Sequence, residues 1–453
     1  DWREFVEMLS SVEQLLRQDA AGVYPHMDFA TRDRYRHVVE AIAKASPLSE
    51  IEVARRVLEL TKAYEGKEQV SKYAHIGYYL IGDGKVQAER VAGISYTLKQ
   101  KIFRAIRKRS LASYLGVIIL LTTIVTSAML YFAYQYGIHN WLLLLVGILS
   151  ACGASQLAIS LVNWIATIVV KPVLLPRMDF SRGIPVEYRT LVVIPTMLSG
   201  HTYLNELLET LERHYLANSE ANVHFGLLTD FPDADIEQLP EDKVLLDIAE
   251  KRIEGLNHKY QKGKEQLFFL FHRPRKWNAK ESKWMGYVRK RGKLAALNAL
   301  LCGQEDGQFS VITGDYHILT QVKYVITLDS DTQLPREAVW KLVATMAHLL
   351  NQPFYDSVKK RVTEGYGILQ PRLASGLPKT KPSLYLQMLG NIDGIDPYTR
   401  ISSDVYQDLF GEGSFIGKGI YDVAIFEQAL QGAFEENRIL SHDLLEGCYA
   451  RSG

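Results

Sequence analysis

The chain has 453 residues, enough for roughly two or three domains, and its formal net charge is only +1. Proteins that bind nucleic acid over a broad surface carry a clear excess of Lys and Arg, so the composition argues against that class. The cysteines are scattered, with no metal-binding spacing or disulfide framework, as expected for cytosolic domains (Cys152, Cys302 and Cys448). The first residue is not Met and no cleavable signal peptide is visible, so we expect a piece of a longer protein.

Residues 1–95 have the apolar spacing of soluble helices. Apolar side chains recur at helical intervals near the N-terminus (Phe5, Met8, Leu9 and Val12). We therefore predict a helical cytosolic domain over this range, without a catalytic constellation. His75 lies in an aromatic-rich stretch, and we expect a packed or helix-capping role for it rather than metal ligation.

A run from Leu111 to Val170 contains no Asp, Glu, Lys or Arg. Segments 111–134 and 141–170 are each long enough to span a hydrocarbon core of roughly 30 Å. The short polar turn between them is flanked by Tyr and Trp, which favour the membrane interface. We predict two transmembrane helices. The alternative is one buried hairpin of a soluble core, although core helices rarely continue so far without charge.

Basic residues flank this run and are absent from its turn. Several precede it, and two follow it (Lys99, Lys101, Arg104, Arg107, Lys108 and Arg109; Lys171 and Arg177). The positive-inside rule then places both flanks in the cytoplasm and the turn outside, so that 96–178 is a basic juxtamembrane segment with two spans. A nucleic-acid patch is the other interpretation, and the position beside a membrane span disfavours it.

From residue 179 to 453 the pattern changes to strands alternating with helices. Short apolar strands are predicted within this region (191–196, 223–228, 267–271, 324–328 and 365–369). Fully apolar strands of this kind are typical of a mostly parallel sheet covered on both faces, so we predict an α/β fold. Polar residues follow successive strands, at the edge where a nucleotide binds in such folds.

One of these strands ends in the carboxylate pair Asp329 and Asp331. Two carboxylates one residue apart are suited to Mg²⁺ or Mn²⁺, and such an ion can hold a diphosphate. The alternative is a structural role at the strand end. The same spacing recurs at Asp233 and Asp235, which we interpret as a solvated loop.

A basic and aromatic stretch precedes Lys293. We predict that Lys293 begins a helix, where its charge and the free amides of the first turn could meet a diphosphate. The alternative is a solvated basic loop with two buried tryptophans, Trp277 and Trp284.

Two further segments near the C-terminal end carry candidate chemistry. Four glycines between 411 and 419 indicate close backbone approach to a ligand or a special turn. Asp443 is either a general base or a first-turn residue of a helix capped by Ser441. The residues alone favour the cap.

The ordered set of these features resembles processive family-2-type glycosyltransferases. Longer stretches resemble the cyclic β-1,2-glucan synthases in particular, and the similarity covers essentially the whole chain (AHIGYYLI, HRPRKWN, WMGYVRKRGKL, LDSDTQLP, GEGSFIGKGIYD and SHDLLEG). This resemblance implies a GT-A domain that acts on UDP-glucose at the cytoplasmic face of the bacterial inner membrane. It also implies a growing glucan acceptor, made on the protein itself and released as a ring.

The resemblance also assigns roles to residues. It implies that Asp230 contacts the uridine, Lys293 the diphosphate and Asp329 the donor, with Asp331 on a Mg²⁺ or Mn²⁺ ion. Asp443 takes the place of the catalytic base. Further donor or acceptor contacts are implied at matching positions (Pro195, Thr196, Gln370, Gly413, Ser414 and His442).

The chain also departs from the family pattern. His442 stands where cellulose synthases carry Glu. The family's Arg/Gln-x-x-Arg-Trp element is expected beyond residue 453, together with further membrane spans and a phosphorylase-like domain. The activity of this segment alone is therefore open. Two other functions stay possible from sequence: a membrane glycosyltransferase that makes another polysaccharide or glycolipid, and a non-catalytic membrane assembly module.

Overall fold

The computed structural model describes residues 2–64, 72–170, 172–260, 266–304, 307–373, 384, 404–434 and 442–453. They form two compact units. The first unit contains Asp1–Ile94, Leu175–Pro371 and Ser414–Ser452, and the second contains Ser95–Leu174, Arg372–Gly413 and Gly453. Each unit is a separate body with its own packing.

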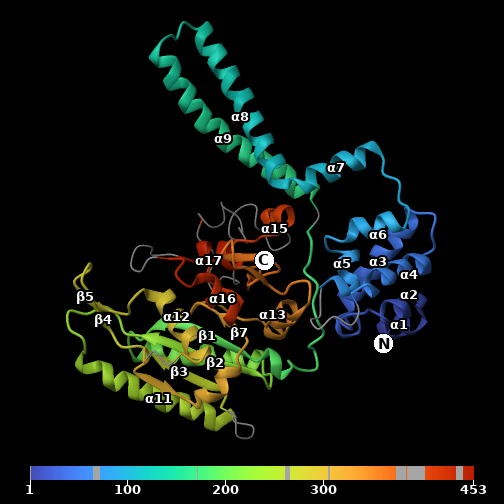
Figure 1. Cartoon of the computed structure of the whole chain (residues 1–453). Helices are drawn as coiled ribbons and strands as arrows, with labels where there is room; N and C mark the ends of the chain where they lie inside the picture. Colours follow the sequence, from blue (N-terminus) through green and yellow to red (C-terminus); the bar gives the residue numbers. More distant parts are fainter. Residues whose placement is uncertain are drawn as a thin grey trace. The chain divides into compact units, whose positions relative to one another are not determined.

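The N-terminal part of the first unit is helical, as predicted (Figure 1: α1 Trp2–Leu9, α2 Ser11–Leu16, α3 Phe29–Lys44, α4 Glu50–Lys62, α5 Ile76–Leu80 and α6 Lys85–Val91). Local sequence explains two of the helix starts. Asp28 accepts a hydrogen bond from the Thr31 amide at the start of α3, and Ser49 and Glu52 form a capping box at the start of α4.

His75 is fully buried in this helical part. Its Nδ1 lies 2.8 Å from Asp19 Oδ2, and its Nε2 lies 3.2 Å from the Tyr35 hydroxyl. The predicted packed role of His75 is therefore confirmed.

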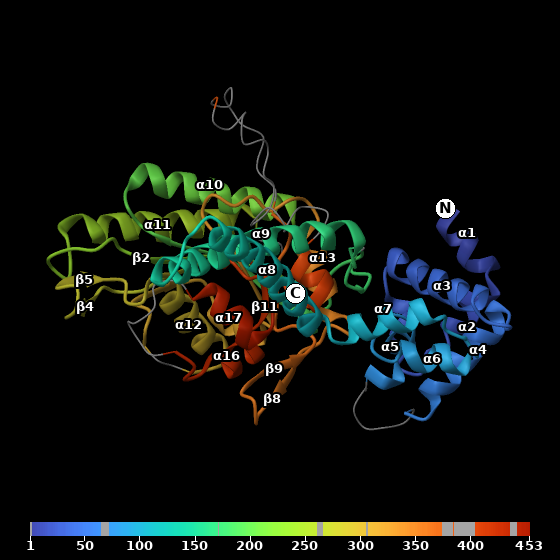
Figure 2. The ribbon, with the colours of Figure 1, turned by 90° about the horizontal axis from the view of Figure 1, so that it is seen from above.

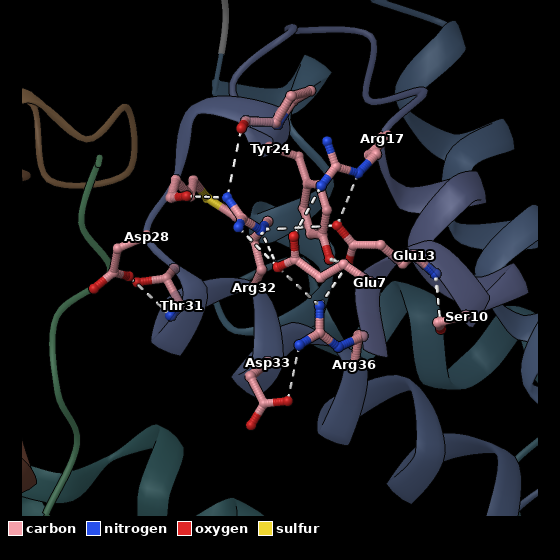
Figure 3. Close-up of polar contacts among 12 residues, drawn as sticks. Glu7, Ser10, Glu13, Arg17, Tyr24, Asp28, Thr31, Arg32, Asp33 and Arg36 are labelled. Carbon is pink, nitrogen blue, oxygen red and sulfur yellow. Dashed lines mark hydrogen bonds and ion pairs between the residues drawn. The ribbon is translucent and has the colours of Figure 1, made fainter. Parts of the chain in front are cut away.

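A group of paired charges joins the first three helices (Figure 3). Glu13 of α2 is fully buried and accepts hydrogen bonds from the Tyr24 hydroxyl and from Arg36, each at 2.6 Å. Glu7 of α1 lies 2.7 Å from Arg32 of α3. A buried charge left without its partner costs several kcal/mol, so these pairs fix the relative positions of α1, α2 and α3.

Within the described residues, the first unit also contains a seven-stranded sheet with the order β10-β11-β7-β1-β2-β3-β6. The strands are short (β1 Thr190–Met197, β2 Val223–Asp230, β3 Phe268–His272, β6 Val311–Thr313, β7 Tyr324–Thr327, β10 Ile368–Leu369 and β11 Gly419–Asp422). Strands β7, β1, β2 and β3 are parallel, whereas β6 and β11 run antiparallel to their neighbours. The predicted α/β fold with a mostly parallel sheet is confirmed.

Helices cover both faces of this sheet (Figure 2). One layer contains α10, α11 and α13, and the other contains α12, α16 and α17 (His201–Ala217, Pro240–Tyr260 and Ala338–Ala347; Arg289–Leu301, Val423–Leu430 and Asp443–Ala450). Strand β1 shows why both layers form: Val192 and Ile194 face the first layer, whereas Leu191 and Val193 face the second. Two small hairpins complete the unit (β4 Lys276–Asn278 with β5 Lys283–Met285, and β8 Phe354–Asp356 with β9 Arg361–Glu364).

The second unit is built around two long apolar helices, at the places predicted for the membrane spans. Its helices are α7, α8, α9 and α15 among the described residues (Leu98–Lys108, Ser110–Gln135, Trp141–Val169 and Val405–Phe410). In that part of the chain, α8 and α9 are long and apolar enough to cross a membrane. They pack side by side as a hairpin (Figure 1).

Asn163 is a buried polar residue near the C-terminal end of α9. Its Oδ1 accepts a hydrogen bond of 2.8 Å from the Tyr114 hydroxyl on α8, and its Nδ2 lies 3.5 Å from the Tyr406 hydroxyl on α15. Polar groups among apolar helices are costly unless they are paired in this way. The contacts therefore fasten α9 to both α8 and α15.

Candidate active site

The candidate site lies at the carboxyl edge of the parallel strands. In the register of β1 and β2, Met197 lies opposite Asp230. The Leu328 amide after β7 donates to the Val193 carbonyl of β1, at 3.0 Å, so Asp329 emerges at the same edge. Because parallel strands end together, Asp230 and Asp329 reach one edge from positions far apart in the sequence.

Asp230 and Lys293 form a buried ion pair at this edge. Lys293 Nζ lies 2.7 Å from Asp230 Oδ1 and donates to the Thr196 carbonyl at 2.7 Å. Arg273 adds a longer contact of 3.4 Å to Asp230 Oδ2. Gly286 backs the pair so closely that a Cβ there would lie 1.9 Å from Asp230 Oδ2. Burial lowers the pKa of Lys293, although the charge of Asp230 opposes that effect.

The predicted position of Lys293 in its helix is wrong. Helix α12 begins at Arg289, so Lys293 lies in the second turn, where its own backbone amide is not one of the free first-turn donors. Position 292 requires glycine, because a Cβ there would lie 2.3 Å from the Tyr287 carbonyl oxygen. The nucleotide contacts assigned to Asp230 and Lys293 stay predictions.

The Asp329 carboxylate lies between two lysines that the sequence did not single out. Asp329 Oδ1 is 2.6 Å from Lys290 Nζ, and its Oδ2 is 3.1 Å from Lys418 Nζ. Lys290 also donates to the Gly417 carbonyl at 2.8 Å. Burial raises the pKa of Asp329, but the hydrogen bonds and charges of the two lysines outweigh it, and the pKa lies below its usual value.

Asp331 is exposed beside this group. Magnesium sites in phosphate-handling enzymes commonly use one or two carboxylates, with substrate phosphates and water as the other ligands. Asp329 and Asp331 fit such a site, and no group of three or more His, Cys, Asp or Glu side chains that could hold a metal occurs among the described residues. A divalent ion on this pair stays a prediction.

The second Asp-x-Asp lies on a surface loop, as predicted. Asp233 pairs with Arg289 through both carboxylate oxygens at 2.9 and 2.7 Å, and Asp235, whose side chain is 84% exposed, pairs with Lys283. The alternative of two buried tryptophans is wrong for Trp277, which is half exposed on the β4–β5 hairpin.

Asp443 is the first residue of α17 and faces the glycine-rich loop. Gly417 has a positive φ of 78°, and a Cβ there would lie 2.8–2.9 Å from the Asp443 carboxyl atoms. Burial raises the pKa of Asp443; the charge of Lys290 opposes this, and that of Asp329 adds to it. Ser441, the alternative cap, lies outside the described residues, and the N-cap position belongs to His442.

Glu446 is a second carboxylate near Asp443 that the sequence did not single out. It lies one turn further along α17, is buried, and has its Oε1 3.7 Å from Arg291 Nε. Burial and the charge of Asp443 raise the pKa of Glu446 to about 7. His442 is also buried, with its ring edge-to-face on Phe434 at 5.4 Å, and burial lowers the pKa of His442.

The remaining candidates lie around this edge. The Thr196 hydroxyl is 2.9 Å from the Tyr203 hydroxyl, and Pro195 precedes it on β1. Gln370 Oε1 accepts a hydrogen bond of 3.1 Å from the Ile416 amide, which ties the glycine-rich loop to the end of β10.

Ser414 is half-buried in the first unit, whereas Gly413 belongs to the second unit. The substrate contacts expected of Pro195, Thr196, Gln370, Gly413, Ser414 and His442 stay predictions.

The site thus brings Asp329 and Asp443 together through Lys290 and through the loop at Gly417.

No protein-family model matches the chain. The chain is 39% identical over 455 aligned residues to the cyclic β-(1,2)-glucan synthase NdvB of Rhizobium meliloti (strain 1021), and the alignment covers all of this chain. The chain is homologous to a segment of a cyclic β-glucan synthase. The predicted resemblance is therefore confirmed, and the chain spans 16% of the length of the rhizobial synthase.

Proposed function

We propose that the chain is the donor-binding and catalytic segment of an inverting glucosyltransferase that builds a cyclic β-1,2-glucan from UDP-glucose. The observation that carries the proposal is the link between Asp329 and Asp443: Lys290 bonds both Asp329 and the Gly417 carbonyl, and Gly417 lies so near Asp443 that a Cβ there would meet its carboxyl group. The homology to a cyclic β-glucan synthase supports the choice of product.

The proposed reaction is a single displacement. The acceptor hydroxyl attacks the anomeric carbon of the glucose from the face opposite UDP, so an α-linked donor gives a β-linkage. The bond from that carbon to the diphosphate breaks, and UDP leaves with the electron pair. Asp443 accepts the acceptor's proton; the raised pKa of Asp443 makes it a better base than an exposed aspartate.

A Mg²⁺ or Mn²⁺ ion held by Asp331 and Asp329 would supply positive charge for the departing diphosphate. The chain's own residues position the groups around it. Gln370 holds the glycine-rich loop through the Ile416 amide, and the Asp230–Lys293 pair keeps the end of β2 closed against α12.

The full-length enzyme in membranes is expected to incorporate radioactive glucose from UDP-glucose into glucan when a divalent ion is present. Asp331→Ala should weaken metal-dependent UDP-glucose binding and lower incorporation by at least tenfold, since it removes an exposed metal ligand. Asp235→Ala is the matched control, because it has the same Asp-x-Asp spacing on the surface loop. Equal incorporation from other sugar nucleotides, or none from UDP-glucose, would contradict the proposed donor.

Membrane topology gives an independent prediction. The basic flanks of α8 and α9 support a site on the cytoplasmic side of the inner membrane. In a background with the native cysteines replaced, an impermeant thiol reagent added to whole cells should label His139→Cys but not Asp235→Cys. The opposite labelling pattern would contradict the two-span topology.

A further inference from the structure

Three lysines reach the candidate site, and they differ in how accessible their side chains are. The Lys293 side chain is 5% exposed, whereas those of Lys290 and Lys418 are 29% and 22% exposed. Lys290 and Lys293 lie one turn apart on α12, and Lys418 comes from the glycine-rich loop. An incoming anion can therefore reach Lys290 and Lys418 far more readily than Lys293.

Lys293 is held in place by two buried groups that depend on its positive charge. Its ammonium group bonds both Asp230 and the Thr196 carbonyl, and Asp230 is itself almost fully buried. Moving Lys293 toward a ligand would leave a buried carboxylate with the longer contact from Arg273 as its remaining ion pair among the described residues. Breaking a buried pair in this way is strongly unfavourable, so Lys293 acts as a structural ion-pair partner.

Lys290 and Lys418 have the opposite arrangement. Both hold the same carboxylate, one on each oxygen of Asp329, so two ammonium groups meet at a single partly exposed anion. Asp329 is itself partly exposed. A ligand with several phosphate oxygens could replace the carboxylate on both ammonium groups without exposing a buried charge.

The neighbouring base in the first turn of α12 does not compete for this role. Arg289 is paired with both carboxylate oxygens of Asp233 on the surface loop. The next base, Arg291, lies beside Glu446 and over the ring of Phe434, at 4.4 Å from its centroid. Among the basic residues at 289–293, Lys290 is therefore the one whose described ion pair is with Asp329.

We propose that Lys290 and Lys418, rather than Lys293, bind the diphosphate of the nucleotide by exchanging the Asp329 carboxylate for phosphate oxygens. This proposal rests on the proposed glucosyltransferase function and names the cations of its donor site. Because Lys290 also bonds the Gly417 carbonyl, the bound diphosphate would connect α12 to the loop that lies next to Asp443.

The test compares UDP with uridine, since the two ligands differ only in the diphosphate. Calorimetry on the full-length enzyme in detergent, at one fixed Mg²⁺ concentration, should show UDP affinity reduced about ten- to hundredfold in Lys290→Met and in Lys418→Met. Uridine affinity should stay unchanged. Lys290→Arg should restore part of the UDP affinity, because it keeps the charge. Lys283→Met, which removes an exposed lysine of β5, is the matched control.

Lys293→Met should behave differently, with a lower melting temperature and no selective effect on UDP over uridine. UDP affinities within twofold of wild type in both Lys290→Met and Lys418→Met would overturn the proposal. The proposed glucosyltransferase function would stand in that case, because the wild type still binds UDP. A selective loss of UDP affinity in a well-folded Lys293→Met would also overturn it. Absence of UDP binding by the wild type would instead overturn the proposed function, and the proposal with it.

Discussion

Asp443→Asn in the full-length enzyme is expected to lower glucose transfer about 10²–10⁴-fold, the usual effect of losing a general base. Asparagine keeps the size of the side chain but cannot accept the acceptor's proton. UDP-glucose binding should change much less than transfer, because the structure describes charge effects of Lys290 and Asp329 on Asp443 but no hydrogen bond or ion pair from it to Asp230 or Lys293. The measurement is incorporation of labelled glucose together with calorimetric donor binding.

The pH dependence of the wild type gives a second measurement of the same role. Burial raises the pKa of Asp443 above its usual value. The base works only when deprotonated, so transfer should fall as the pH drops through this raised pKa, at higher pH than for an exposed aspartate. Asp235→Asn should leave the profile unchanged. Transfer by Asp443→Asn near the wild-type rate would return Asp443 to a structural role in the first turn of α17.

Gly417→Ala is expected to reduce transfer about 10²-fold or more, although the substitution adds a single methyl group. Its Cβ would lie 2.8–2.9 Å from the Asp443 carboxyl atoms, so either the loop or Asp443 must move. A small displacement of a catalytic group is enough to produce a loss of this size. Transfer rates of detergent-purified variants, with donor affinity measured in parallel, provide the test.

Gly432→Ala is a close control for this substitution. Gly432 has a φ of +69° and Gly417 a φ of +78°, so alanine is strained by a similar amount at both positions. A Cβ at Gly432 would meet nothing within 4 Å. Equal losses in the two variants would show that backbone strain alone accounts for the effect, and that the contact with Asp443 does not matter for transfer.

The parallel core of the sheet could be predicted from sequence because its strands are continuous apolar runs bounded by polar residues. Strands β6 and β11 were missed for physical reasons. Each is short, and β11 begins at the last glycine of a stretch that was interpreted as a ligand approach or a special turn. Its antiparallel pairing with β7 depends on a tertiary contact that local periodicity does not encode.

The candidate site shows the same division between local and tertiary information. Asp329 and Asp331 were recognisable because they end a strand, and Asp443 because of the surrounding motif. Lys290 and Lys293 are equally basic and close in sequence, so composition could not tell which one is buried. That difference depends on Asp230, which reaches Lys293 from another strand. Helical spacing on α12 was the available signal that placed Lys290 on the same side as Lys293.

The hydrogen bond between Tyr114 and Asn163 bears on how the protein is made. On an isolated α9, Asn163, near the end of the helix, would enter the bilayer without its partner on α8, and an unpaired polar group is costly there. Its partner on α8 is synthesised first, and the intervening turn contains no Lys or Arg to be carried across. Insertion of α8 and α9 as one helical hairpin during translation therefore costs less than insertion one at a time. Nascent chains that end before α9 are expected to integrate less stably than those that contain both helices.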